Sequence, residues 1–287
     1  MSDEAAGRPG RLVLVGTPIG NLGDLSPRAV LVLAGADIVA CEDTRMTRKL
    51  LTHAGIRARR LVAVHEHNEV AAAAGLVESM LAGATVAVVS DAGMPAISDP
   101  GRHLVAAAAA AGVVVDVVPG PSAAVAALVI SGMATDRFCF EGFLPRKGGE
   151  WAARLADMAA EPRSVVLYES PRRVSATVGS LLAACGADRP LAVGRELTKL
   201  HQEMWRGTLA EAAAWLASVE PRGEYVLVLG GARRADREVD DASIETALVE
   251  RLATDPDRKA AVAAVARSLD VPKRRVYDIA LWVAKGH

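Results

Sequence analysis

The stretch 90–101 reads S-D-A-G-M-P-A-I-S-D-P-G and directly follows the apolar run 84–89. Asp91 and Asp99 place two carboxylates on one short loop, where they can accept hydrogen bonds from an amine or from ribose hydroxyls. Gly93 allows the backbone to approach a ligand closely. A tight turn before a capped helix would give the same pattern. Because open α/β sheets bind ligands at the carboxyl ends of their strands, we expect a ligand loop here.

Other polar segments also end predicted strands. C-E-D-T-R follows a strand at 36–40, and H-E-H-N follows a strand at 61–64. The adjacent carboxylates Glu42 and Asp43, with Arg45 nearby, could be a solvated helix start or a general base held by its own ion pair. The H-x-H pair has no matching Cys or His cluster elsewhere, so we expect a polar rim of a cleft and no metal site.

Composition limits the class of protein. Among 287 residues, 51% are hydrophobic and 23% charged, which is typical of a soluble globular chain. The net charge of -1 excludes a protein that coats nucleic acid by bulk charge, so any RNA contact must rest on local basic patches. Three widely spaced cysteines suggest neither a zinc site nor a disulfide framework. With no signal peptide and no expected membrane span, we expect a cytoplasmic protein.

The elements that must position these residues alternate along the chain. After a disordered tail at 1–10, strand, helix and Gly/Pro loop alternate, which predicts an N-terminal α/β domain with a parallel sheet at 11–131. The rhythm breaks at 132–146, where we place the boundary, and a second α/β domain with a mixed sheet follows at 142–231. Residues 241–287 read as a helical, helix-turn-helix-like tail, either basic and RNA-binding or a packing appendage.

Eight segments together carry a family resemblance. They are V-G-T-P-I-G-N-L-G-D-L-S-P-R-A at 15–29, C-E-D-T-R at 41–45, H-E-H-N at 65–68, S-D-A-G-M-P-A-I-S-D-P-G at 90–101, P-G-P-S-A at 119–123, D-R-F-C-F-E-G-F-L-P at 136–145, Y-E-S-P-R-R at 168–173 and R-E-L-T-K at 195–199. In this order they resemble the ribosomal RNA small subunit methyltransferase I family, a branch of the tetrapyrrole (corrin/porphyrin) methylase superfamily. Met94 departs from the threonine usual in that family, which removes one hydroxyl beside the expected cofactor site.

The resemblance implies two α/β domains of the tetrapyrrole-methylase type, with S-adenosylmethionine bound in the cleft between them. It implies methyl transfer to the ribose 2′-hydroxyl of a cytidine in the decoding region of 16S rRNA, without a metal. A ribose hydroxyl is a weak acid, so a base should accept its proton, and the unranked candidates are Glu42, Asp43, His65 and Glu196. The expected substrate is 16S rRNA within the small ribosomal subunit, and the expected assembly is a homodimer, to which the apolar stretch 138–144 contributes. Two alternatives remain open: a methylase of a small tetrapyrrole, and a non-enzymatic RNA-binding factor for ribosome assembly.

Residues are assigned by the same resemblance. The expected cofactor-binding residues are Thr17, Pro18, Ser90, Asp91, Ala92, Gly93, Pro95, Asp99, Gly120, Pro121, Ser122, Ala123, Leu167, Tyr168 and Val228. The expected RNA-binding residues are Arg45, Arg172, Arg173, Arg195, Lys199, Lys273, Arg274 and Arg275. The last three belong to the helical tail, and their positive charge suits contacts to phosphates.

Overall fold

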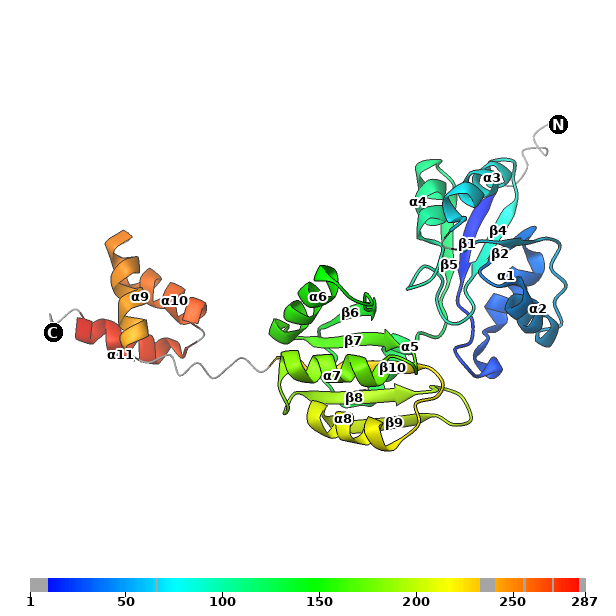
Figure 1. The fold of residues 1–287 in the computed structure, drawn as a ribbon. Coiled ribbons are helices and arrows are strands. Elements are labelled where there is room, and N and C mark those ends of the chain that lie inside the picture. Colours follow the sequence, from blue (N-terminus) through cyan, green and yellow to red (C-terminus); the bar gives the residue numbers. More distant parts are fainter. Residues whose placement is uncertain (1–9, 66, 233–240, 255–256, 270, 284–287) are drawn as a thin grey trace, which may run out of the picture. The chain divides into compact units, whose positions relative to one another are not determined.

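The computed structural model describes residues 10–65, 67–232, 241–254, 257–269 and 271–283 (Figure 1). The chain divides into two compact units, Met1–Ala232 and Arg233–His287. The expected tail at 1–10 lies outside the described residues except for Gly10, which is buried. A Cβ on Gly10 would lie 2.0 Å from the carbonyl oxygen of Met80, so this last position of the predicted tail belongs to the folded domain.

The first sheet is wholly parallel, as predicted, in the order β3-β2-β4-β1-β5. Its strands are β1 (Arg11–Val15), β2 (Ile38–Cys41), β3 (Leu61–Ala63), β4 (Thr85–Val89) and β5 (Val114–Val118). Between them lie η1 (Leu22–Asp24), α1 (Pro27–Gly35), α2 (Thr44–His53), α3 (Glu69–Leu81) and α4 (Arg102–Ala110). The inner strands are nearly continuous apolar runs because helices cover both faces of such a sheet. Because all five strands run parallel, their carboxyl ends lie at the same edge of the sheet.

The second sheet is mixed, in the order β6-β7-β10-β8-β9. Its strands are β6 (Phe138–Phe143), β7 (Ser164–Glu169), β8 (Pro190–Arg195), β9 (Glu203–Thr208) and β10 (Tyr225–Leu229). Only β6 and β7 run parallel, and β8 pairs with β9 as the expected hairpin. The sequence did not indicate β6, because a register shift between Phe140 and Gly142 interrupts its alternation.

Helix α5 (Ala123–Ser131), which the prediction above assigns to the domain at 11–131, packs against the second sheet. Its buried Ala127 and Leu128 share an apolar cluster with Val166 and Val228. The helix is apolar on nearly every side, so its sequence gave no sign of which sheet it would cover.

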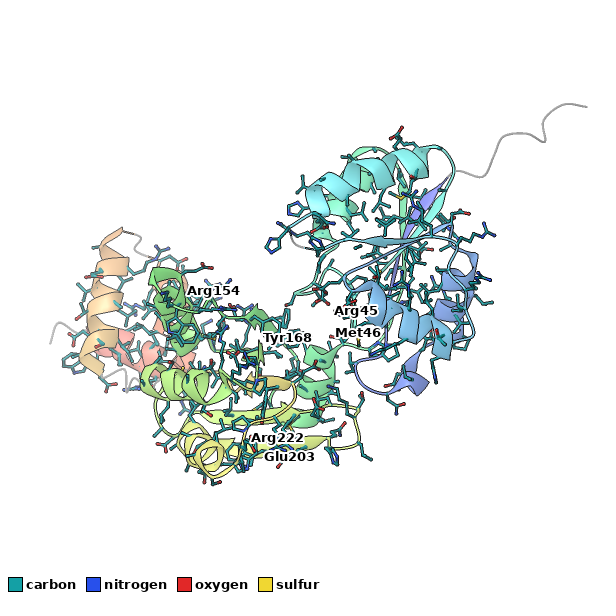
Figure 2. The ribbon with its side chains drawn as sticks, turned by 45° about the vertical axis from the view of Figure 1, so that its right-hand side comes forward. Arg45, Met46, Arg154, Tyr168, Glu203 and Arg222 are labelled. Carbon is teal, nitrogen blue, oxygen red and sulfur yellow. The ribbon has the colours of Figure 1, made fainter. Side chains whose placement is uncertain are left out.

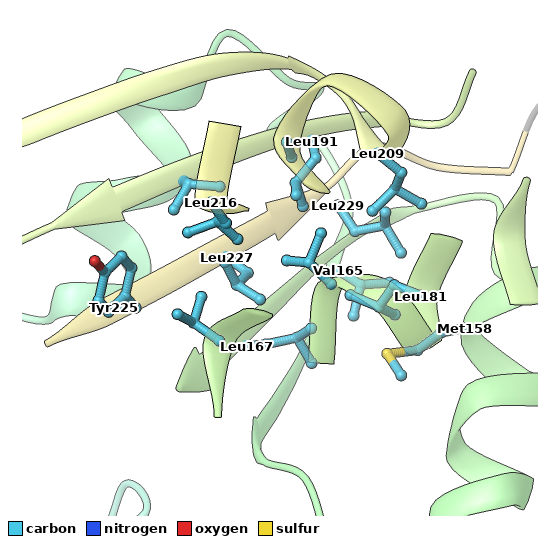
Figure 3. Packing of buried hydrophobic residues seen from close by; sticks show 14 of the residues in the cluster. Met158, Val165, Leu167, Leu181, Leu191, Leu209, Leu216, Tyr225, Leu227 and Leu229 are labelled. Carbon is cyan, nitrogen blue, oxygen red and sulfur yellow. The ribbon is translucent and has the colours of Figure 1, made fainter. Parts of the chain in front are cut away.

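The other face of the second sheet holds the main core of that domain. Helices α6 (Gly149–Ala160), α7 (Val174–Cys185) and α8 (Leu209–Ser218) contribute to it. Figure 3 shows Leu167 and Leu227 of the sheet packed with Leu181 and Leu216 from the helices. Successive residues of a strand point to opposite faces, so Leu167 faces this core while Tyr168 faces α5.

The C-terminal unit consists of α9 (Asp241–Thr254), α10 (Arg258–Leu269) and α11 (Lys273–Val283), as the sequence predicted. Its small core includes Ile244, Val262 and Val276. The guanidinium of Arg275 is paired with Asp241, with 2.7 Å between Nη2 and Oδ1, and ties α11 to the start of α9. Across the part of the chain described, no helix combines the length and apolar character that crossing a membrane requires.

Candidate active site

The loops that follow β1 and β4 are joined at the carboxyl edge of the first sheet. Thr17 and Gly93 exchange backbone hydrogen bonds, 2.9 Å from Thr17 N to Gly93 O and 3.1 Å from Gly93 N to Thr17 O. The buried Thr17 hydroxyl also donates to the Ser90 carbonyl oxygen at 3.3 Å. The buried residues Thr17 and Ser90 therefore connect the two loops.

Glycine is required where the loops after β1 and β5 meet. A Cβ on Gly16 would lie 2.6 Å from the Cα of Gly120, and a Cβ on Gly120 would lie 2.7 Å from the Cα of Gly16. Both contacts are with backbone, which cannot rotate away. Gly93 has a φ of +81°, in the left-handed region that favours glycine. The close approach of the backbones thus shapes the floor of the site.

A cavity of about 320 Å³ lies against these loops, between the two domains of the first unit. It falls within the range of small-molecule sites, roughly 300–1,000 Å³. Seven of the expected cofactor-binding residues line it: Asp91, Ala92, Gly93, Asp99, Ser122, Ala123 and Tyr168. Its walls also include Ile19, Met94, Ile97, Ser98, Phe143, Glu169, Ser170, Pro171, Leu197, Glu224, Tyr225 and Val226.

Several of these lining residues were not assigned from the sequence. Phe143, Glu169 and Ser170 lie inside segments that carried the family resemblance, so their motifs held a usable signal. Ile97 and Leu197 also lie inside such segments, at 90–101 and 195–199. They reach the cavity through the backbone path of the loops, and sequence alone does not give that path.

Other expected residues do not line this cavity. Pro18 lines a neighbouring cavity, and Pro95 is buried within the loop after β4. Gly120 and Pro121 set the path of the loop before α5. Leu167 and Val228 are fully buried in the two apolar clusters on opposite faces of the second sheet. Tyr225 and Val226, at the start of β10, line the cavity instead of Val228.

Tyr168 is the wall contributed by β7. Its hydroxyl accepts a hydrogen bond from the Ala124 amide at 3.2 Å, at the start of α5. Phe140 and Phe143 pack on its ring, with centroids 5.0 and 5.6 Å away. Burial raises the pKa of the Tyr168 hydroxyl, so the group stays protonated and polar at neutral pH. The side chain is thus fixed between the cavity and α5.

Carboxylates gather at the edge of the first sheet. Burial, with the neighbouring charge of Glu42, raises the pKa of Asp99 to about 6. Burial and the charge of Asp43 also raise the pKa of Asp91. Glu42 shows the same direction, because burial and the charge of Asp91 raise its pKa. Such a cluster is stabilised by a positively charged ligand.

The structure separates the four candidate bases into two groups. Asp43 caps α2 by accepting from the Arg45 amide at 2.7 Å, and its hydrogen bonds to Arg45 lower its pKa to about 2. Burial works against ionisation of Glu196, but Lys199 Nζ at 2.7 Å and the Glu224 amide keep its pKa below the usual value. Both carboxylates are committed to internal partners.

Glu42 and His65 are placed differently. Among the described residues, Glu42 forms no ion pair, and burial with the charge of Asp91 raises its pKa. His65 is exposed after the end of β3, and its charge acts on Glu42. Glu42 therefore differs from Asp43 and Glu196, whose carboxylates have internal ion-pair partners.

Most of the expected RNA-binding cations also have internal partners. Arg45 pairs with Asp43, and Arg195 with Glu203. Arg173 donates to the Leu144 carbonyl at 2.9 Å. Within the residues that the structure describes, Arg172, Lys273 and Arg274 are exposed and form no ion pair. The three tail residues Lys273, Arg274 and Arg275 belong to the second unit.

Comparison with known proteins decides the family. The family model Tetrapyrrole (Corrin/Porphyrin) Methylases matches residues 11–213. A Synechocystis sp. protein named Ribosomal RNA small subunit methyltransferase I is 44% identical over 273 residues, which is 95% of this chain and 98% of that protein. The chain belongs to the ribosomal RNA small subunit methyltransferase I family. This confirms the resemblance carried by the eight segments.

Further relatives agree. The protein of the same name from Mycobacterium tuberculosis (strain CDC 1551 / Oshkosh) is 50% identical over 224 residues, 78% of each chain. Among solved structures, a uroporphyrin-III-C-methyltransferase from Thermus thermophilus matches with a TM-score of 0.53 and 25% identity, over 78% of this chain and 94% of that one. Cobalt precorrin-4 methyltransferase matches with a TM-score of 0.59 and 16% identity, over 77% and 94%. The two-domain fold is therefore that of the tetrapyrrole methylases.

Proposed function

We propose that this protein transfers a methyl group from S-adenosylmethionine to the ribose 2′-hydroxyl of a cytidine in the decoding region of 16S rRNA. The observation that carries the proposal is the acidic cavity between two tetrapyrrole-methylase domains, in a chain 44–50% identical to proteins named for methylating small-subunit ribosomal RNA. The small-tetrapyrrole alternative shares the fold, but its solved examples are only 16–25% identical.

The residues present fit the cofactor. S-adenosylmethionine supplies a methyl group already activated on a positively charged sulfonium. Asp91 and Asp99 offer acceptors for its ammonium and ribose hydroxyls, and burial raises the pKa of both carboxyl groups, which a positively charged ligand would offset. Ile19, Ile97 and Val226 give the cavity apolar walls suited to an adenine ring.

Residues of this chain must also align the nucleophile and accept its proton. A ribose hydroxyl is a weak acid, so a carboxylate with a raised pKa is an effective acceptor. Glu42 has such a pKa and no ion pair among the described residues. The rigid contact between the loops at Gly16 and Gly120 orients the floor of the site before ligands bind, which lowers the entropic cost of reaction.

The assembly belongs to the same proposal. β5 is an edge strand of the first sheet, and Val114 and Val117 on it are 58% and 45% exposed. On α5, Val129 is 62% exposed, and Phe143 on β6 is 55% exposed. Apolar surface of this extent favours a partner, and we propose a homodimer that acts in the cytoplasm on the small ribosomal subunit. Light scattering that gives the mass of one chain at micromolar concentration would contradict the dimer.

A labelled-methyl assay tests the function. Purified protein is incubated with methyl-labelled S-adenosylmethionine and either 16S rRNA or unmethylated small subunits, and the RNA is digested to nucleosides. We expect label in 2′-O-methylcytidine. A Gly120→Leu variant, whose side chain would clash with the backbone of Gly16 and displace the loops beside the cavity, serves as the inactive control. Label in a base, or none in RNA despite cofactor binding, would refute the proposal, and RNA binding without cofactor binding would favour an assembly factor.

A further inference from the structure

A second cavity, of about 600 Å³, opens beside the first. Helix α2 contributes Met46, Lys49 and Leu50 to its lining, and Leu22 of η1 lies among the other lining residues. The second domain contributes Lys199 and Glu224. Met46, Lys49 and Leu50 were not among the residues predicted from the sequence, and they do not line the first cavity.

The two cavities share part of their walls. Asp91, Ala92, Ile19 and Glu224 line both. A ligand in each cavity would therefore meet the other at the Asp91–Ala92 segment. Methyl transfer requires the oxygen and the methyl group within about 3–3.5 Å of each other, so the substrate's ribose must lie at such a shared wall.

The lining suits a nucleotide. Leu22 and Met46 are 45% and 46% exposed, and they present apolar surface large enough to contact the face of a base. Figure 2 shows Arg45 and Met46 on the first domain and Tyr168 on the second. Lys49 is exposed and forms no ion pair within the described residues. Lys199 differs, because its ammonium lies 2.7 Å from Glu196 and 3.1 Å from Glu224.

We propose that the second cavity receives one RNA nucleotide turned out of its stack, an inference that rests on the proposed function. Met46 and Leu22 contact the base, and Lys49 contacts a flanking phosphate. The ribose lies at the Asp91–Ala92 wall. Enzymes that do chemistry on a base inside a duplex turn the nucleotide out of the stack to reach it, and single-stranded RNA is recognised by contacts to exposed base faces.

Helix α2 offers a matched control. Arg48 precedes Lys49, carries the same charge and is exposed, yet it does not line the cavity. Lys49→Gln, Arg48→Gln and Met46→Ala are compared by fluorescence anisotropy on a short single-stranded RNA carrying the target cytidine, without cofactor. KM for the RNA and the Kd for S-adenosylmethionine are measured in parallel, and thermal melting checks the fold.

We expect Met46→Ala to weaken RNA binding roughly tenfold, the loss expected for a base contact. Lys49→Gln should weaken it severalfold and flatten the slope of log K against log salt by about 0.7, the value for one lost phosphate contact on a single strand. Arg48→Gln should change both less, and all three should keep the affinity for S-adenosylmethionine.

Equal effects of Lys49→Gln and Arg48→Gln, or an unchanged RNA affinity and KM in Met46→Ala, would overturn the inference and leave the RNA on the outer surface of α2. Failure of the proposed function looks different: the unaltered protein itself would then transfer no methyl group to RNA. The two failures are therefore distinguished by the unaltered protein alone.

Discussion

Replacing Glu69 with alanine should destabilise the first domain and loosen the loop after β4. Glu69 is 5% exposed at the start of α3. Its Oε1 accepts from the amides of Gly101 at 2.9 Å, His103 at 2.7 Å and Leu104 at 3.3 Å. Gly101 is the N-cap residue of α4 and has no side chain to cap that helix, so Glu69 caps it from α3.

The magnitude follows from these bonds. A hydrogen bond to a charged group contributes about 1.5–3 kcal/mol, and a buried amide left unpaired costs about 1–3 kcal/mol. Two short bonds and one long one give a loss of roughly 3–5 kcal/mol for Glu69→Ala. For a folded unit of this size the midpoint of thermal unfolding should fall by roughly 6–20 °C. Glu69→Gln keeps an acceptor oxygen and should lose about 1 kcal/mol.

Glu69→Ala should also weaken binding of the cofactor. The loop between β4 and α4 holds Ala96 at a φ of 68° and Ser98 at a φ of 60°, backbone conformations that cost of order 1–3 kcal/mol each. Without its anchor at Gly101 the loop can relax from this conformation. Asp99 would then leave the cavity, and we expect the affinity for S-adenosylmethionine to fall at least tenfold.

Calorimetry or far-UV circular dichroism measures the stability, because all four tryptophans lie at 151 or beyond and their fluorescence does not report the first domain. Isothermal titration measures cofactor affinity well below the unfolding temperature. A Glu69→Ala protein that loses less than about 1 kcal/mol and binds the cofactor normally would refute the capping argument.

Three further changes test other parts of the site and the core. Gly120→Ala places a Cβ 2.7 Å from the Gly16 backbone and should abolish cofactor binding measured by titration calorimetry. The control Gly35→Ala, whose Cβ would have nothing within 4 Å, should bind the cofactor normally. Equal cofactor affinity in the two variants would contradict the role given to the Gly16–Gly120 contact. Because burial raises the pKa of Asp99 from 3.8 to about 6, the folded protein binds more protons between these values. Lowering the pH from 7 to 5 should therefore stabilise the fold through this group but weaken binding of the cationic cofactor, and Asp99→Asn should reduce that pH dependence in titrations at both pH values. Arg189→Met should destabilise the second domain by roughly 3 kcal/mol in chemical unfolding. The reason is that the buried guanidinium of Arg189 donates hydrogen bonds to carbonyls at the end of α6 and at Gly230. A loss of less than about 1 kcal/mol would contradict this structural role.

The sequence predicted the parallel sheet and the ligand loop because both follow from local pattern. Apolar runs such as 85–89 are followed closely by Gly, Asp and Pro, and this local change in composition predicts a strand and the loop after it without knowledge of the fold. It did not predict β6, whose bulge at Gly142 disturbs the alternation, or the packing of α5, whose apolar surface carries no preferred face.

Side-chain roles were harder to predict than loops. Glu42 and Asp43 are adjacent and chemically alike, yet one has a raised pKa and the other caps a helix. Only the path of the backbone into α2 decides between them. Similarly, Leu167 and Tyr168 are neighbours on β7, and the register of the sheet sends one into the core and the other to the cavity.

The most direct test of the central claim is ribose-methylation mapping of small-subunit ribosomal RNA from cells with and without this protein. The RNA is digested and 2′-O-methylcytidine is quantified and located by mass spectrometry, with a Gly120→Leu gene as the inactive complement. We predict that one 2′-O-methylcytidine in the decoding region of 16S rRNA disappears without the protein and returns only with the unaltered gene. An unchanged set of methylated riboses in cells that lack the protein would contradict the account.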